Sequence, residues 1–266
     1  MGSKLNLIYD LAFVYTSFER EVEFMDKSYP KIKKLWLILA WVIVIPLYFG
    51  LSSIIVEALK IFISPDDKEL LTMVGQTVFY AIVLVILIPA CSRILKESFK
   101  KKNKFKNFWK AFGIFWAFKF GSAFLMGILA ALTGNVNTSS LISDNQNTLN
   151  SMMTSVPLFT WLFAVVFAPI IEEMVFRGVI FQTFRRFGAT FAVLGSAFLF
   201  AFIHVIGEIG TVSPLMFLIH ILPYLGMAIP LSWMCEKYKD ITICMMVHMS
   251  SNLIAMLVQM LLMQFM

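Results

Sequence analysis

Charged residues are scarce in this sequence of 266 residues: 14% are Asp, Glu, Lys or Arg, while 59% are hydrophobic. Several apolar runs are longer than about eighteen residues, the length at which a helix can cross the hydrocarbon core of a bilayer. With a mean hydropathy of +0.82, the chain is not expected to pack as a soluble globular protein. The composition therefore predicts an all-α fold, a polytopic transmembrane helix bundle.

Cysteine is sparse as well. Cys91, Cys235 and Cys244 form no C-x-x-C pair and lie in or near apolar segments, which is typical of small buried hydrophobes rather than of a disulfide or zinc framework. The H-E-x-x-H motif of zinc proteases is also missing. No cleavable signal is expected, because the first apolar span begins only near Leu35.

The basic residues gather beside the apolar spans rather than on a separate polar domain. Residues 93–110 contain a single acid, Glu97, and eight basic residues: Arg93, Lys96, Lys100, Lys101, Lys102, Lys104, Lys106 and Lys110. This pattern is typical of a cytoplasmic loop that contacts the bilayer or anionic lipid, so nucleic acid is not an expected partner. Residues 134–155 carry no Lys or Arg, as expected of an external loop.

Seven apolar spans are expected, at about residues 35–63, 70–95, 111–133, 156–184, 189–207, 214–235 and 241–265. Alternating crossings place every Lys- or Arg-bearing turn on one side, which predicts a multi-pass protein of the cell membrane with a cytoplasmic N-terminus. The chain then divides into a cytoplasmic lead (1–34), N-terminal transmembrane helices and loops (35–155) and a C-terminal transmembrane core (156–266). The lead is either an interfacial helix or a poorly ordered tail.

Residues 170–178 place two carboxylates and a guanidinium in an otherwise apolar segment. Each charge at membrane depth costs several kcal/mol, so three of them within six residues indicate a function. Glu173 and Arg177 are four residues apart on one helical face and are expected to pair. Glu172 points about 100° away and faces another partner.

Two further helices bring candidate partners. His204 lies about as far after the turn near residues 187–188 as Glu172 lies before it, roughly 23–25 Å along each helix, so an antiparallel hairpin places them side by side. Phe200, one turn before His204, is expected to wall the imidazole. His248 and Asn252 are four apart on the last helix and present an imidazole and a carboxamide on one face.

Each of these features has a purely structural interpretation. Glu173 with Arg177 can be a staple between helices, and His248 with Asn252 can be interhelical hydrogen-bonding groups. We assign His220 a packing role. Lys119, in the third span, is expected to snorkel toward the surface, or else to line a cavity. Counted from the preceding turn, His248 lies only roughly 11 Å into its helix, so either that turn dips into the protein or the helices tilt strongly.

The three motifs Glu172-Glu173-x-x-x-Arg177, Phe200-x-x-x-His204 and His248-x-x-x-Asn252 resemble, in order and spacing, those of the CPBP intramembrane proteases. This is the CAAX-processing and bacteriocin-processing family, also called Abi, and the resemblance covers about residues 156–260. It implies an intramembrane endopeptidase that cleaves a membrane-associated peptide or protein.

The resemblance also implies roles for these residues. The glutamate matching Glu172, with the histidine matching His204, would activate the attacking water. The residues matching His248 and Asn252 would stabilise the oxyanion, while Glu173 and Arg177 shape the site. A carboxylate, two imidazoles and an amide are also the groups that hydrolysis needs on chemical grounds.

Two alternatives remain open from the sequence. Glu172, His204 and His248 could serve as three zinc ligands with a free position for water, although the resemblance favours a metal-free glutamate mechanism with no cofactor. A non-catalytic immunity or scaffold protein of the same family is the alternative function. A transporter is disfavoured because no internal repeat is visible.

Overall fold

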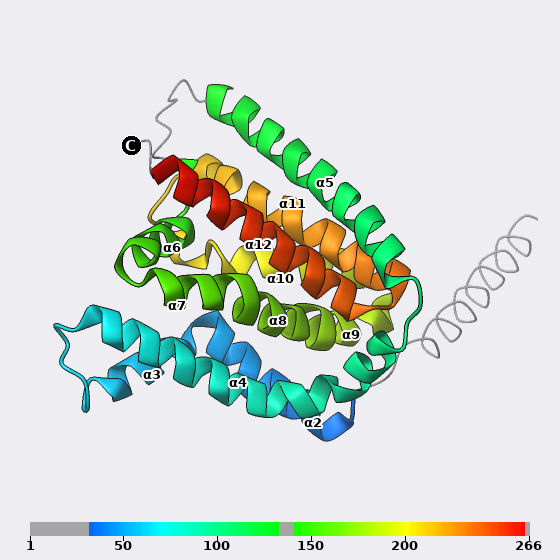
Figure 1. Cartoon of the computed structure of the whole chain (residues 1–266), viewed down its shortest axis with the longest axis horizontal. Helices are drawn as coiled ribbons and strands as arrows, with labels where there is room; N and C mark the ends of the chain where they lie inside the picture. The colour runs from blue at the N-terminus through cyan, green and yellow to red at the C-terminus, as the bar shows by residue number, and fades with distance from the viewer. Residues whose placement is uncertain (1–31, 133–140, 264–266) are drawn as a thin grey trace, which may run out of the picture.

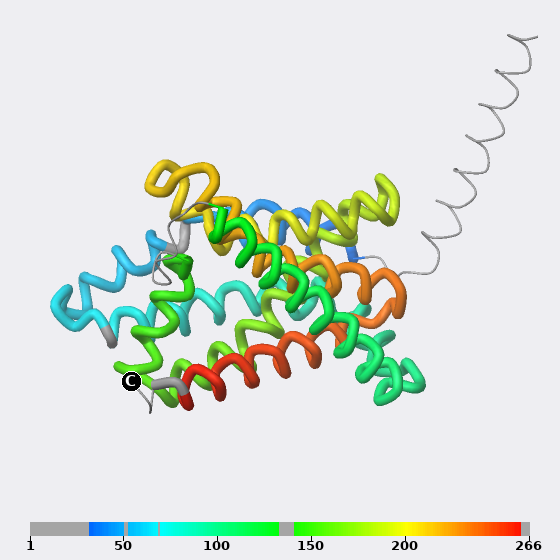
Figure 2. The backbone as a smooth tube through the Cα atoms, turned by 90° about the horizontal axis from the view of Figure 1, so that it is seen from above, coloured from blue at the N-terminus to red at the C-terminus, as the bar shows by residue number. Residues whose placement is uncertain are grey.

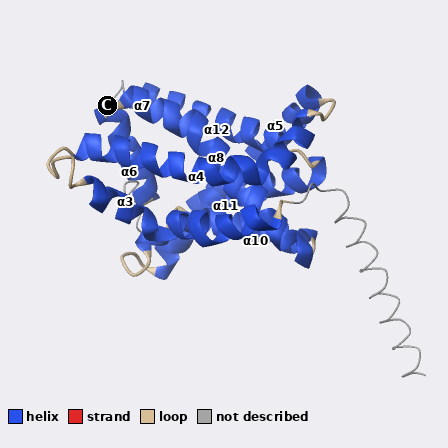
Figure 3. Ribbon diagram, turned by 90° about the horizontal axis from the view of Figure 1, so that it is seen from below, coloured by secondary structure: helices blue, strands red, loops and turns tan. Residues whose placement is uncertain are grey.

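The computed structural model describes residues 32–132 and 141–263, and every regular element in these ranges is helical (Figures 1 and 3). The longer helices are α4 (Lys68–Phe99), α5 (Lys104–Leu132), α6 (Asp144–Ser155), α10 (Ala189–Ile203), α11 (Pro214–Tyr238) and α12 (Ile241–Met263). The predicted all-α bundle is confirmed. Nearly all of the cytoplasmic lead (1–34) lies outside the described residues, so its interfacial helix stays a prediction.

The first apolar span is a broken one. It consists of α2 (Lys34–Leu39), the π-helical turns η1 (Ala40–Val44) and η2 (Leu47–Leu51), and α3 (Ser52–Leu59). The chain bends by 75° after Gly50, whose φ of +133° is accessible to glycine but strained for other residues. The bend turns α3 away from the axis of α2.

The helix that carries the paired glutamates also departs from regular α geometry. Its consecutive segments are α7 (Pro157–Leu162), the π turn η4 (Phe163–Phe167), α8 (Ala168–Glu173), the π turn η5 (Met174–Ile180), α9 (Phe181–Phe184) and the 3₁₀ turn η6 (Arg185–Phe187). A π turn widens the helix and shifts its hydrogen bonds, so carbonyls become available to other partners. The carbonyl oxygen of Phe176 accepts a hydrogen bond from Ser196 Oγ at 2.7 Å, which ties this helix to α10.

The expected count of seven crossings is not confirmed. Within the described ranges, five helices are long and apolar enough to span a membrane: Leu70–Phe99, Lys104–Leu132, Pro157–Phe187, Pro214–Tyr238 and Ile241–Leu261. The bent α2–α3 pair raises the number to six if it counts as one span. With 15 residues, α10 is about 22 Å long and falls short of the roughly 30 Å core. The protein is nevertheless multi-pass, and the side on which its N-terminus lies stays a prediction.

The expected external loop also contains a helix. Residues 144–155 form α6, whose first turn is capped by Ser143, because its Oγ accepts from the backbone N–H of Gln146 at 3.3 Å. Glu208, in the 3₁₀ turn η7 (Ile206–Glu208), accepts from the N–H of Asp144 at 2.8 Å. This end of the bundle is therefore held by polar contacts rather than left as open loops.

The turn between α11 and α12 is buried. Asp240 and Ile241 are each 1% exposed, and the N–H of Ile241 donates to Ser98 Oγ at 3.1 Å. Lys104, at the start of α5, reaches Thr242 Oγ1 at 2.5 Å and Asp240 Oδ2 at 3.6 Å. Lys237, three residues before Asp240, is exposed, so both explanations for the shallow position of His248 stay open.

α5 covers one side of the bundle and packs most extensively on α11 (Figure 2). The closest approach uses a glycine: a Cβ built on Gly226 of α11 would lie 2.0 Å from Ser122 Oγ and 2.5 Å from Ser122 Cβ. The two backbones therefore meet as small-residue contacts allow in membranes.

We expect Gly226→Ala to destabilise the protein by about 1–3 kcal/mol, the usual cost of overpacking, because the new methyl group displaces α5. Thermal unfolding in detergent measures the effect. Adding Ser122→Gly should restore part of the loss. Gly113→Ala, on α5 with no neighbouring atom within 4 Å of the new Cβ, serves as the control and should be at least as stable as the parent, since alanine favours a helix over glycine. Equal losses for the two alanine variants would contradict this packing.

The topology can be tested separately, because the basic residues between 93 and 110 predict that this loop is cytoplasmic. A membrane-impermeant thiol reagent added to intact cells should label Thr148→Cys on α6 and leave Lys101→Cys unlabelled. The three native cysteines are buried and give a low background. Labelling of Lys101→Cys alone would reverse the predicted orientation.

Candidate active site

Glu173 and Arg177 form the ion pair that their spacing predicts. Both side chains are fully buried, and Arg177 Nη1 donates to Glu173 Oε1 at 3.1 Å. Arg177 Nη2 donates to the carbonyl oxygen of Ala228 on α11 at 3.1 Å, and the guanidinium lies 4.7 Å from the centre of the Phe200 ring on α10. The pair thus joins α8 and η5 to two other helices.

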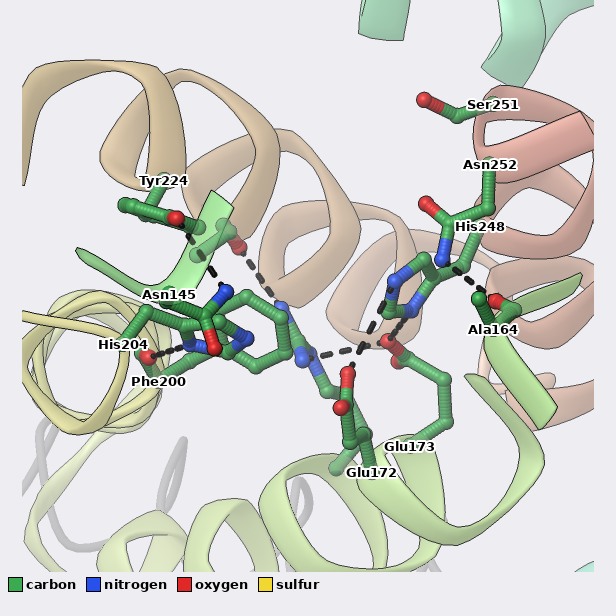
Figure 4. A network of polar contacts seen from close by, with 12 residues as sticks. Asn145, Ala164, Glu172, Glu173, Phe200, His204, Tyr224, His248, Ser251 and Asn252 are labelled. Carbon is green, nitrogen blue, oxygen red and sulfur yellow. Dashed lines mark hydrogen bonds and ion pairs between the residues drawn. The ribbon is translucent and has the colours of Figure 1, made fainter. Parts of the chain in front are cut away.

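His248 of α12 contacts both glutamates (Figure 4). Its Nδ1 is 2.9 Å from Glu173 Oε1, and its Nε2 is 3.7 Å from Glu172 Oε2. When Nδ1 is protonated, this N–H donates a hydrogen bond to Glu173. The bond holds the ring in place with Nε2 directed toward Glu172. Oε1 of Glu173 therefore contacts both the Arg177 guanidinium and the His248 imidazole.

Glu172 differs from its neighbours in accessibility. Its side chain is 16% exposed, whereas that of Glu173 is fully buried and that of His248 is 1% exposed. Because Glu172 and Glu173 point to different sides of the helix, one carboxylate is used for the internal ion pair and the other stays reachable. A group that takes a proton from water needs this access.

His204 makes no direct hydrogen bond or ion pair to Glu172 among the described residues, whereas His248 does contact Glu172. The His204 ring packs against Phe200 and Tyr224, with 4.6 Å between ring centres in each pair, and its Nδ1 lies 2.7 Å from the carbonyl oxygen of Phe200. His204 directly follows the last residue of α10, Ile203. The predicted approach of His204 to Glu172, with a water between them, stays a prediction. The predicted wall of Phe200 is present.

Asn252 uses its amide to bind the glutamate helix. Its Nδ2 donates to the carbonyl oxygen of Ala164 at 2.8 Å, within the π turn η4. The Nδ2 group carries a second hydrogen, so this bond does not exhaust its donor capacity.

Lys119 does not snorkel, which corrects the default expectation. Its Nζ donates to Ser251 Oγ on α12 at 2.9 Å and lies 5.1 Å from the centre of the Trp116 ring. It binds α5 to α12 next to Asn252. The signal in the sequence was a lysine in an apolar span, but its partner, 132 residues away, could not be read from it.

The assignment of His220 as a hydrogen-bonded packing residue is confirmed. His220 is 5% exposed, and its Nδ1 lies 2.5 Å from Glu208 Oε2. Tyr224, one turn later on α11, pairs with Ser143 Oγ at 2.7 Å while its ring stacks on His204. Sequence reasoning missed Tyr224 because an aromatic residue in an apolar helix carries no distinguishing signal.

The zinc alternative requires Glu172, His204 and His248 to converge on one point. In the described part of the chain, no group of three or more His, Cys, Asp or Glu side chains is arranged to hold a metal ion. His204 Nδ1 bonds to a backbone carbonyl and His248 Nδ1 to Glu173, so Nε2 is the nitrogen that each ring has left for a metal. The zinc alternative and the metal-free mechanism both stay predictions.

Fold and site together define the class: a multi-pass α-helical membrane protein with carboxylates, an imidazole and a guanidinium clustered inside the bundle. Residues 154–254 match the family described as Type II CAAX prenyl endopeptidase Rce1-like. This match spans all three motifs and agrees with the resemblance to the CPBP proteases over that segment.

A similar curated protein is UPF0177 protein YvdC from Lactococcus lactis subsp. lactis (strain IL1403). It is 25% identical over 251 residues, which covers 94% of this chain and 86% of the relative. No solved structure matches the chain.

The geometry predicts different costs for the two adjacent glutamates. Glu173→Gln removes the anionic partner of a fully buried guanidinium, so it should reduce the free energy of unfolding by about 3–5 kcal/mol. Glu172→Gln is the matched control, because Glu172 is the adjacent residue and has no bond to Arg177. Its free energy of unfolding should stay near that of the parent. Denaturant unfolding of both variants in detergent measures the difference. Similar stabilities would show that the buried pair is not a structural centre.

Proposed function

We propose that this chain is an intramembrane endopeptidase that cleaves a membrane-associated peptide or protein with a glutamate-activated water, without a metal. The observation that carries the proposal is the arrangement of Glu172: a reachable carboxylate 3.7 Å from an imidazole whose other nitrogen is held by a buried carboxylate. This geometry combines a base with an oriented partner, as general acid–base catalysis requires.

In the proposed reaction, water loses a proton to the Glu172 carboxylate while its oxygen attacks the scissile carbonyl carbon. The carbonyl π electrons move onto oxygen and form a tetrahedral oxyanion. As the intermediate collapses, the C–N bond breaks and the protonated Glu172 returns the proton to the leaving amine. The products are a carboxylic acid and an amine, which ionise to a carboxylate and an ammonium group, and the Glu172 carboxylate is regenerated.

Two groups are proposed to stabilise the oxyanion. His248 donates through Nε2 when it is protonated there, since Glu173 and its partner Arg177 hold the other side of the ring. Asn252 offers the second hydrogen of its Nδ2, because the first is bound to the carbonyl oxygen of Ala164. Donors fixed before the reaction stabilise developing charge without reorganisation.

His204 is proposed to position the water. If Nδ1–H donates to the carbonyl oxygen of Phe200, Nε2 is left as an acceptor for a water proton. Its packing against Phe200 and Tyr224 restricts the ring. Catalytic hydrogen bonds are often longer in the free enzyme than with substrate, so a role beside Glu172 is compatible with the present arrangement.

A non-catalytic scaffold or immunity protein of the same family is the second candidate. It is favoured by one observation: Asn252, Arg177 and His204 all bond to backbone carbonyls, which is also what residues retained for packing would do. The two candidates differ in whether Glu172 transfers a proton, and this difference can be tested.

We expect Glu172→Gln to abolish cleavage of a membrane-anchored peptide in proteoliposomes while thermal stability in detergent is unchanged, because glutamine keeps the size but cannot accept the proton. Asn252→Ala should lower the rate by roughly two to three orders of magnitude, the usual loss of one oxyanion donor. Glu57→Gln, an exposed carboxylate on α3, is the control and should cleave like the parent.

Full cleavage by Glu172→Gln would overturn the proposal, and biological activity that persists without cleavage would favour the scaffold. Metal content is measured on the same samples. Stoichiometric zinc whose removal abolishes turnover would contradict the metal-free mechanism.

A further inference from the structure

A groove of about 500 Å³ lies between the beginning of α5 and the outer side of α12. Its lining is almost entirely apolar and includes Phe105 and Phe108 from α5 and Met249 and Leu253 from α12. Phe105 is 78% exposed and Leu253 is 40% exposed, so the groove opens outward toward the bilayer. One cationic side chain, Lys104, lies among the lining residues.

The groove uses a different face of α12 from the candidate active site, and Val165 of η4 also lines it. Met246, Met249 and Leu253 form a stripe at i, i+3 and i+7 on α12. Helix geometry places the centre of this stripe about 110° around the axis from the midpoint of His248 and Asn252. One face of α12 therefore carries the polar cluster, and another face lines the groove.

The depth of the groove corresponds to one leaflet. Lys104 binds Thr242 Oγ1 at the start of α12, and Leu253 lies eleven residues further along this helix. At 1.5 Å per residue the distance is about 16 Å, or roughly half of the 30 Å hydrocarbon core. A groove of this length suits a single acyl chain from the leaflet at the α5 start.

The polar end of the groove is strongly basic. Lys104 belongs to the basic loop, which we define as residues 93–110, where eight Lys and Arg residues face one acid, Glu97. Lys100, Lys101, Lys102 and Lys106 are exposed around it. Phe99, 70% exposed, and Trp109, 54% exposed, add the aromatic side chains typical of a membrane interface.

We propose that this groove is a binding site for an anionic phospholipid, with one acyl chain along α12 and the headgroup phosphate held by the basic loop. Charge complementarity selects this occupant, because a zwitterionic headgroup would gain much less from so many cations. The only buried acid at this end, among the described residues that contact Lys104, is Asp240, and it is already bonded to Thr242. The site is independent of the proposed proteolysis.

The test is native mass spectrometry of the purified full chain after incubation with equimolar phosphatidylglycerol and phosphatidylcholine of identical acyl chains. We expect selective retention of phosphatidylglycerol. In Met249→Trp the larger side chain fills the groove and should lower retention of both lipids at least tenfold. Phe124→Trp, on an exposed face of α5, is the matched control and should bind like the parent.

The headgroup is tested separately with the triple variant Lys100→Gln, Lys101→Gln and Lys102→Gln, which leaves Lys104 and its buried partners intact. Each cation near an anionic headgroup contributes about fivefold in affinity, so the triple variant should bind phosphatidylglycerol about a hundredfold more weakly. Binding of phosphatidylcholine should not change. Equal retention of the two lipids by the parent would overturn the proposal, and so would unchanged binding in the triple variant or in Met249→Trp.

Discussion

The buried guanidinium of Arg177 is the constraint on which the centre of this structure depends. A charge inside a membrane bundle is stable only if it is paired, and a lost partner costs several kcal/mol. Glu173, the Ala228 carbonyl oxygen and the Phe200 ring supply those contacts from three separate segments. Because Glu173 also holds His248, the same charge balance fixes the position of α12.

The geometry of the glutamate helix makes these contacts possible. The π turn η4 lies before the glutamates and the π turn η5 lies directly after them. Both turns make backbone carbonyls available at membrane depth. Asn252 binds the Ala164 carbonyl oxygen in the first, and Ser196 binds the Phe176 carbonyl oxygen in the second. The irregular turns of the glutamate helix therefore provide fixed contacts with α12 and α10. This arrangement preorganises the polar cluster, which any hydrolytic role would require.

Two faces of α12 lie in different environments. One face carries His248, Asn252 and Ser251, which are bonded to α8, η4 and α5. Another face lines the apolar groove beneath the basic loop. Its buried first turn is held by Ser98 and Lys104, so the loop that faces the bilayer surface also anchors the helix that completes the cluster. The basic loop and the polar cluster therefore contact the same helix.

The sequence alone determined the all-helical membrane class, because hydropathy and the scarcity of charge depend on composition and not on packing. It also determined the Glu173–Arg177 pair and the Phe200 wall of His204, since both follow from the fixed rise and rotation of one helix. The number of crossings did not follow, because a 15-residue apolar helix and a bend at Gly50 look like ordinary spans in a hydropathy profile. The contact of Glu172 with His248 was decided only by the tertiary structure. It depends on two π turns that rotate the glutamate helix and on a buried turn before α12, and these features arise from contacts between segments far apart in the chain.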